Sequence, residues 1–248
     1  MKELCPNIYE FARHWNFAPN VTQALQALEL VDKEDNDGVI CAAKAMVECA
    51  CKTIVEELDD PSDPIKSWPN SPIKSSDPTL GNWMSAATNL LKLVSDKTDA
   101  FNSIIGQYNQ LATKLGQFRN KAGTIGHGRM GFEQKLSAHH RRTALVTADS
   151  VIGFLHDAYL STQTDPTSTF EPYDRFPQIN HAIDAHSAFV AAEVEEDGTL
   201  YGRISFGKDK AEHVFSVSVS EFLFGTDRFA YREAFLETSG KPELEAEV

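Results

Sequence analysis

Apolar residues recur at intervals of three and four over four long segments in the first two thirds of the chain. In residues 39–58 the series consists of Val39, Ala43, Met46, Val47, Ala50, Ile54 and Leu58. Similar series run through about 80–95, 99–119 and 134–160. This spacing is that of one face of an α-helix. Four helices that each need to bury an apolar stripe predict an antiparallel helical bundle.

The pattern changes after about residue 162. The segment STQTDPTSTFEPYD has the composition of a linker. AFVAAEV and TLYGRISF, joined by an E-D-G turn, predict a β-hairpin. Residues 214–220 alternate strictly between apolar and polar and predict a further strand, and 226–238 predict a final helix. Between the helical segments, the proline-rich residues 62–79 predict a loop.

These patterns predict a mainly α protein with a small α+β unit at its C-terminal end. We divide the chain into an N-terminal helical extension at 1–38, a helical bundle at 39–162 and an α+β unit at 163–248. A length of 248 residues allows one large domain or two small ones.

Charge is unevenly distributed along the chain. The net charge is −13, yet residues 114–142 contain seven Lys or Arg residues and one acidic residue, Glu133. A basic island in an acidic chain is a candidate anion-binding site, or else a solvated helix face. We expect a cytoplasmic protein without a membrane span, because no apolar run reaches about 20 residues. The four cysteines form no C-x-x-C pair, and we expect them to be reduced.

The glycine-rich segment FRNKAGTIGHGRMG, residues 118–131, lies inside this island. It contains G-x-G-x-x-G, but a dinucleotide site needs a strand before the glycines, and the preceding residues have helical periodicity. No G-K-[ST] follows, which excludes a Walker loop. Glycines at this place are typical of a turn that ends one helix and leads into the next.

Three residues of the segment have side chains suited to cleaving RNA without a metal. Arg119 offers a planar set of donors to a phosphate, and His127 can accept or give a proton near neutral pH. Asn120 can orient the histidine or the substrate. In such a reaction the base takes the proton of a ribose 2′-hydroxyl, whose oxygen attacks the adjacent phosphate while the arginine stabilises the developing charge.

The segment RNKAGTIGHG, placed between two helices of a bundle, resembles the signature of HEPN-type domains, and more specifically that of the abortive-infection C-terminal family, Abi_C. Three further stretches carry the resemblance, which covers about residues 39–160. They are AAKAMVECACKTIVEEL, LLKLVSDKTDAFNSIIGQYNQLATKLGQFRN and HHRRTALVTADSVIGFLHDAYL.

The resemblance implies a HEPN-like bundle that acts as a metal-independent endoribonuclease of antiphage-defence or toxin type, with RNA as its partner and no cofactor. Arg119, Asn120 and His127 are then the catalytic residues. It also implies a homodimer, or a higher oligomer, whose copies share one cleft, and an antitoxin or regulatory protein as a further partner.

This chain departs from the family pattern in one spacing. Seven residues separate Arg119 from His127, where the family has four to six. A non-catalytic RNA-binding or sensing module therefore stays open as the alternative, as does a purely structural dimerisation bundle. Arg129 stands two residues after the histidine, where some relatives have a tyrosine that is modified, so that form of regulation is not expected.

Further residues of the island are candidates for contacts with RNA phosphates, because basic side chains supply most nonspecific affinity for nucleic acids. They are Lys121, Gly126, Gly128, Arg129, His140, Arg141 and Arg142. The alternative for the block His139–Arg142 is a solvated first turn of the closing helix. His181, Asp184 and His186 match no zinc spacing, so no metal site is expected.

Overall fold

The computed structural model describes residues 1–32, 36–93, 99–122, 137–162, 165, 167–206 and 211–239. They belong to two compact units, Met1–Phe170 and Glu171–Val248. The prediction of a mainly α chain with a small strand-containing unit at its C-terminal end is confirmed.

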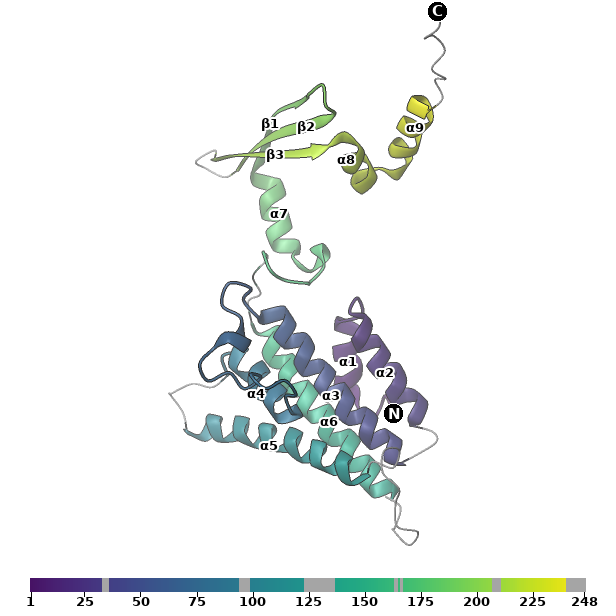
Figure 1. Ribbon diagram of the computed structural model, residues 1–248, viewed down its shortest axis with the longest axis vertical. Helices are drawn as coiled ribbons and strands as arrows, with labels where there is room; N and C mark the ends of the chain where they lie inside the picture. Colours follow the sequence, from purple (N-terminus) through teal and green to yellow (C-terminus); the bar gives the residue numbers. More distant parts are fainter. Residues whose placement is uncertain are drawn as a thin grey trace, which may run out of the picture. The chain divides into compact units, whose positions relative to one another are not determined.

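The first unit is a bundle of helices (Figure 1). Its described elements are α1 (Pro6–His14), α2 (Pro19–Val31), α3 (Asn36–Leu58), the 3₁₀ turn η1 (Ile65–Ser67), α4 (Leu80–Leu90), α5 (Asp99–Ala122) and α6 (Ala138–Leu160). The α3 and α6 helices form the centre, and each packs against several of the others. Residues 62–79, predicted as a loop, contain only η1 and turns.

One continuous core fills the bundle. The apolar stripe of α3 is buried, including Ile40, Met46 and Ile54, and it packs with the apolar side of α6. The helix α1 adds Phe11 to the same core, and Trp15, directly after its last residue, is buried there as well. The first 38 residues, named above as an extension, therefore share the core of the bundle, because α1 has an apolar stripe of its own that packs on α6.

Three predicted helix ends differ from the observed ones. The helix predicted to reach 95 ends as α4 at Leu90, because Lys92 adopts a left-handed φ of 54°. The Lys92 N–H then donates to the Asn89 carbonyl (2.9 Å) and the Leu93 N–H to that of Thr88 (3.1 Å), which closes a Schellman motif. The next helix, α5, continues past the predicted 119 to Ala122, and α6 begins at Ala138 instead of 134.

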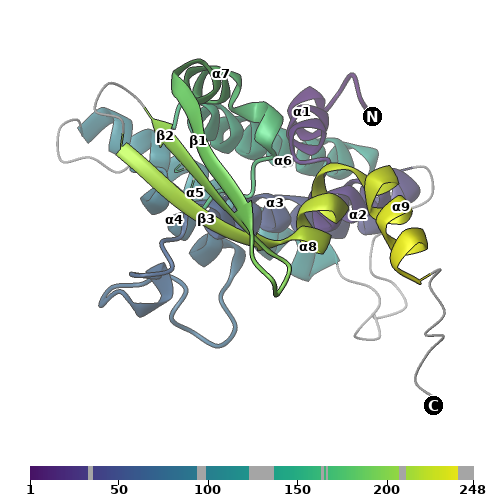
Figure 2. The ribbon, with the colours of Figure 1, turned by 90° about the horizontal axis from the view of Figure 1, so that it is seen from above.

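The second unit contains a three-stranded antiparallel sheet in the order β1-β2-β3 (Figure 2). Its described elements are η2 (Tyr173–Arg175), α7 (Pro177–His186), β1 (Ser187–Val194), β2 (Thr199–Phe206), β3 (Ala211–Ser218), α8 (Val219–Thr226) and α9 (Arg228–Ser239). The predicted hairpin is confirmed as β1 and β2, with Gly198 in the turn at a left-handed φ of 81°.

The helices of this unit were predicted only in part. The strand predicted to run to residue 220 ends at Ser218, whose side chain accepts the Glu221 N–H and begins α8. The final helix is preceded by Asp227, whose carboxylate accepts the N–H groups of Phe229 and Ala230 (both 3.0 Å). These two caps divide the end of the unit into α8 and α9. The helix α7 was not predicted.

Candidate functional site

The last turn of α5 carries the first part of the predicted motif. Arg119, Asn120 and Lys121 lie there, directly before the helix ends at Ala122. Because the negative end of the helix dipole lies at the C-terminus, cations are favoured in this turn. The described backbone thus puts two basic residue positions in a turn where positive charge is favoured.

The position of Arg119 on α5 follows from the buried residues before it. Ile105, Ala112 and Leu115 are buried on one side of α5. Arg119 comes four residues after Leu115 and seven after Ala112, so helical geometry puts its Cα on that same side. The side of α5 that is apolar inside the bundle therefore has an arginine position where the helix ends.

The first turn of α6 lies at the same end of the bundle, because α5 and α6 pack against each other in opposite directions (Figure 1). Ser137 is the N-cap of α6, and its N–H donates to Nδ1 of His140 at 3.2 Å. The Ser137 hydroxyl also lies 2.7 Å from that nitrogen. The Nδ1 of His140 therefore serves as an acceptor that caps the helix.

Arg141 and Arg142 lie in the same turn, but in different surroundings. Arg141 forms an ion pair with Asp32, which follows α2, and is about one-third exposed. Arg142 is exposed and makes no ion pair among the described residues. Positive charge at a helix N-terminus opposes the helix dipole. Asp32 compensates this at Arg141, whereas the charge of Arg142 is open to an external anion.

The remaining predicted site residues, Gly126, His127, Gly128 and Arg129, lie outside the described residues, as do the side chains of Arg119, Asn120 and Lys121. The segment that contains His127 connects the end of α5 to the start of α6. The turn of Arg119 at the end of α5 and the turn of His140–Arg142 at the start of α6 therefore lie at the same end of the bundle. The rest of the predicted motif belongs to the segment that joins them.

A buried carboxylate that sequence reasoning did not single out ties α1 to α6. Asp149, in the middle of α6, accepts the Ile8 N–H (2.9 Å) and an amide hydrogen of Asn7 (2.8 Å). It therefore caps α1, whose own N-cap residue, Cys5, supplies no side-chain bond. Burial raises the pKa of Asp149, while these hydrogen bonds oppose the rise. The sequence signal was an acid within a helix segment that is otherwise apolar on that side.

A second buried carboxylate, Glu57 at the end of α3, holds the last residues of the bundle. It accepts hydrogen bonds from the Thr169 hydroxyl (2.5 Å), the Phe170 N–H (2.8 Å) and the Tyr159 hydroxyl (3.3 Å). Buried carboxylates are uncommon unless they are bonded in this way. Glu57 therefore fixes residues 169–170 to α3 and α6.

The structure offers no metal site within the described residues, where no three His, Cys, Asp or Glu side chains are grouped suitably. His181, Asp184 and His186 are all exposed on α7, and Nδ1 of His186 lies 2.8 Å from the Ala182 carbonyl. Among the helices of the described chain, none combines the length and apolar character that a membrane span requires.

Comparison with known proteins identifies one family. The model of the Abi_C family, described as a HEPN-like domain, matches residues 20–159. The match extends from the start of α2 to the last turn of α6 and includes Arg119 and His127. No curated protein and no solved structure matches the chain.

Proposed function

The chain belongs to the Abi_C family of HEPN-like domains, and from this membership we propose that it is a metal-independent endoribonuclease. The family suggests a function related to abortive infection. The observation that carries the proposal is the position of Arg119 and Asn120 in the last turn of α5, opposite the basic first turn of α6.

Each residue of the motif has a separate role in the proposed reaction. His127 takes the proton of the 2′-hydroxyl, and the 2′-oxygen forms a bond to the adjacent phosphorus. The bond from phosphorus to the 5′-oxygen breaks, and the leaving oxygen takes up a proton. The products are a 2′,3′-cyclic phosphate and a 5′-hydroxyl. Arg119 binds the phosphate and stabilises its added charge, and Asn120 orients the histidine or the substrate.

Features of the described residues support this division of roles. His140 uses its Nδ1 to cap α6, and Arg141 pairs with Asp32, so both have structural tasks in the free protein. Arg142 is exposed without an ion pair among the described residues and suits contact with an RNA phosphate. We further propose that two copies of the chain combine their motifs in one cleft, and that an antitoxin or regulatory protein controls the activity.

The test is cleavage of a fluorescent single-stranded RNA in EDTA. We expect Arg119→Ala and His127→Ala each to lower the rate by roughly a hundredfold or more, which is the scale for removing a general base or an electrostatic stabiliser. Arg13→Ala and His181→Ala, at exposed positions of α1 and α7, are the matched controls and should cleave as the wild type does. Cleavage that survives both motif substitutions, or that stops in EDTA, contradicts the proposal.

One observation favours a second candidate function, that of a non-catalytic RNA-binding or sensing module. Seven residues separate Arg119 from His127, one more than the family pattern has at most. In that case the wild-type chain binds the RNA without cleaving it, and Arg142→Ala weakens binding to all sequences alike.

A further inference from the structure

A polar groove lies between the first turns of α4 and the middle of α5. It has a volume of about 520 Å³. Its lining residues are Thr79, Gly81, Asn82, Ser85, Asn109, Gln110, Thr113 and Lys114. The two helices approach closely beside it, since a Cβ on Gly81 would lie 2.6 Å from Oγ1 of Thr113. The groove therefore lies next to a direct contact between α4 and α5.

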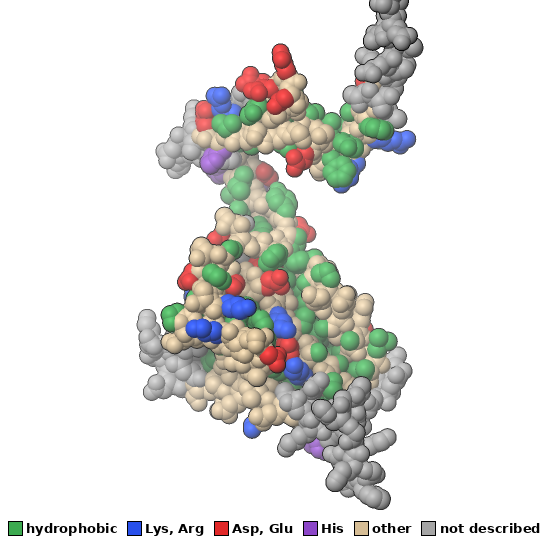
Figure 3. Space-filling view, in the orientation of Figure 1, with side chains coloured by type: hydrophobic (Ala, Val, Ile, Leu, Met, Phe, Trp, Pro, Cys, Tyr) green, Lys and Arg blue, Asp and Glu red, His purple; other side chains and the backbone are tan. Residues whose placement is uncertain are grey.

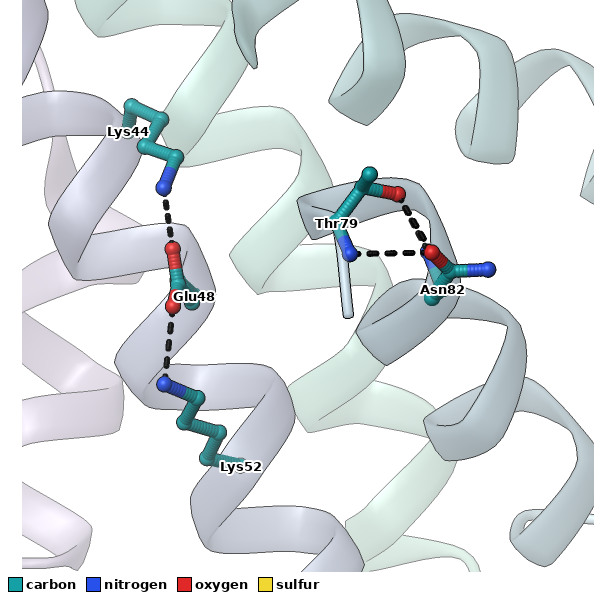
Figure 4. A network of polar contacts seen from close by, with 5 residues as sticks. All are labelled: Lys44, Glu48, Lys52, Thr79 and Asn82. Atoms are coloured by element: carbon teal, nitrogen blue, oxygen red, sulfur yellow. Dashed lines mark hydrogen bonds and ion pairs between the residues drawn. The ribbon is translucent and has the colours of Figure 1, made fainter. Parts of the chain in front are cut away.

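The polar groups that line the groove are bonded within the protein only in part. Asn82 accepts hydrogen bonds from Thr79 through Oδ1, and its amide nitrogen points away from Thr79 (Figure 4). Oδ1 of Asn109 is buried without a hydrogen-bond partner. The Lys114 ammonium group donates to Oε1 of Gln117 (3.2 Å), which leaves its charge uncompensated by any carboxylate in the lining. Because Oδ1 of Asn109 is buried, the groups that the groove offers to a ligand are the amides of Asn82 and Gln110 and the cation of Lys114.

The charge pattern around the groove is unusual for this chain. The protein has 36 acidic residues, yet none lies between Asp99 and Glu133. In the space-filling view, the described surface over α4 and α5 consists mainly of backbone and of side chains that are neither charged nor hydrophobic (Figure 3). Hydroxyl, amide and lysine side chains without neighbouring carboxylates are the groups that proteins use to contact the phosphates and sugars of nucleic acids.

Helical geometry connects the groove to the motif. Lys114 and Lys121 are seven residues apart on α5, so they lie on one side of the helix, about 10 Å apart along its axis. Gln117, which accepts the bond from Lys114, lies between them on that side. An RNA strand that reaches the last turn of α5 can therefore follow this side of the helix to the groove.

We propose that the α4–α5 groove binds the sugar–phosphate backbone of single-stranded RNA beside the cleavage motif, with Lys114 contacting a phosphate. This inference rests on the proposed function for its ligand class. The groove adds affinity without reading sequence, because backbone contacts carry no base information. An acidic peptide is the competing ligand, and the test includes it.

The experiment measures binding of the full chain to a fluorescent oligouridine of about 12 nucleotides, a length within the range of single-strand sites. Its sugars are 2′-O-methylated, so that attack by the 2′-oxygen is blocked. Lys114→Gln removes the charge, and Gln110→Glu places a carboxylate at the groove without changing side-chain size. The matched controls are Lys66→Gln and Gln26→Glu, both at exposed positions away from the groove.

We expect Lys114→Gln to weaken binding roughly fivefold at about 0.1 M salt and to lower the slope of log Kd against log salt by about 0.7, which corresponds to one phosphate contact. We expect Gln110→Glu to weaken binding as well, and the controls to match the wild type. Circular dichroism melting curves identical to that of the wild type establish that each variant is folded. A poly-glutamate peptide should not compete with the RNA.

The outcomes separate this inference from the proposed function. If Arg119→Ala weakens RNA binding while the groove variants and the controls bind as the wild type does, only the proposal for the groove is overturned. Groove variants that weaken binding, together with cleavage that survives Arg119→Ala and His127→Ala, support the groove and contradict the nuclease mechanism. A wild-type chain that does not bind the RNA, or binds the peptide in its place, overturns the groove as an RNA site.

Discussion

The bundle and the C-terminal unit bury their apolar residues to very different extents. In the bundle, large side chains such as Phe11, Met46 and Ile152 are fully buried in one core. In residues 171–239, Gly202 alone is buried among the residues whose exposure is described, and aromatic side chains such as Phe229 are 70% exposed. The bundle therefore has a packed apolar core, whereas the described part of the C-terminal unit combines strand pairing with side-chain contacts that stay largely exposed.

The sheet shows the same difference in the arrangement of its faces. The strand register places Leu200, Ile204, Phe215 and Val217 on one face and the serines of β3 on the other. The ring of Phe215 lies over Gly202, which has no side chain in its way. The face is patterned as an interior surface but is covered only in part by the described residues of its own unit.

Two isoleucines provide the sharpest test of this difference. Ile54 is fully buried in α3, and Ile183 is 50% exposed on α7. We expect Ile54→Ala to lower the free energy of unfolding by about 2–5 kcal/mol, because it removes buried methyl groups and leaves a cavity. Ile183→Ala should change it by less than about 0.5 kcal/mol. Urea denaturation followed by circular dichroism gives both values, and equal effects would contradict the comparison.

Two aspartates extend the test to polar groups. Asp149 bonds α1 from within the bundle, whereas Asp184 is exposed on α7. Asp149→Ala should cost about 1–3 kcal/mol of unfolding free energy, because the Ile8 N–H loses its acceptor. Asp184→Ala should be close to neutral. If both variants unfold at the same urea concentration as the wild type, the bond between α6 and α1 does not stabilise the bundle.

The pH dependence of stability in the wild type and in Asp149→Asn tests whether burial raises the pKa of Asp149. Burial raises the pKa of Asp149 above its ordinary 3.8, so the folded protein binds this proton more tightly than the unfolded chain does. The wild type should therefore gain stability relative to Asp149→Asn as the pH falls through the folded pKa, and the gain should level off below about 3.8. If the difference in stability between the wild type and Asp149→Asn is constant with pH, the pKa of Asp149 is not raised.

The smallest expected effects come from the two left-handed residues in the described part of the chain, one in each unit. Lys92 adopts a φ of 54° after α4, and Gly198 a φ of 81° in the hairpin turn. Lys92→Gly should raise the free energy of unfolding by up to about 1 kcal/mol, because it removes the crowding of a Cβ in this conformation. Gly198→Ala should lower it by about 1 kcal/mol, although a Cβ there meets no atom within 4 Å. Changes of the same sign in thermal melts would refute this backbone argument.

The elements that sequence predicted well are those with a regular local pattern. The apolar stripes of α3 and α6 and the alternation in the hairpin arise from the repeat of a single helix or strand, so nearby residues suffice to recognise them. The helix ends were harder, because Lys92 closes a Schellman motif without the usual glycine, and Ser218 begins α8 while the alternation of β3 still continues.

The candidate site likewise has features that the sequence predicted and features that it did not. The residue types of Arg119, Asn120 and His127 and their place between two helices were readable in the sequence, and the family match includes them. Their catalytic roles stay a prediction. The structural tasks of His140 and Arg141 were not readable, because a cap depends on where the helix starts and the ion pair joins residues 109 positions apart.

The sequence by itself therefore determined the helical bundle, the hairpin and the basic motif, because periodicity and residue chemistry are local properties. Only the tertiary structure decided which polar residues bond to other parts of the protein and which ones line a groove that can bind a ligand. Asp149 reaches α1 across 141 positions, Glu57 holds Phe170 across 113, and the α4–α5 groove leaves Lys114 beside amide groups without a carboxylate. Such pairs depend on how helices pack, and packing is set by the whole core instead of by any one segment.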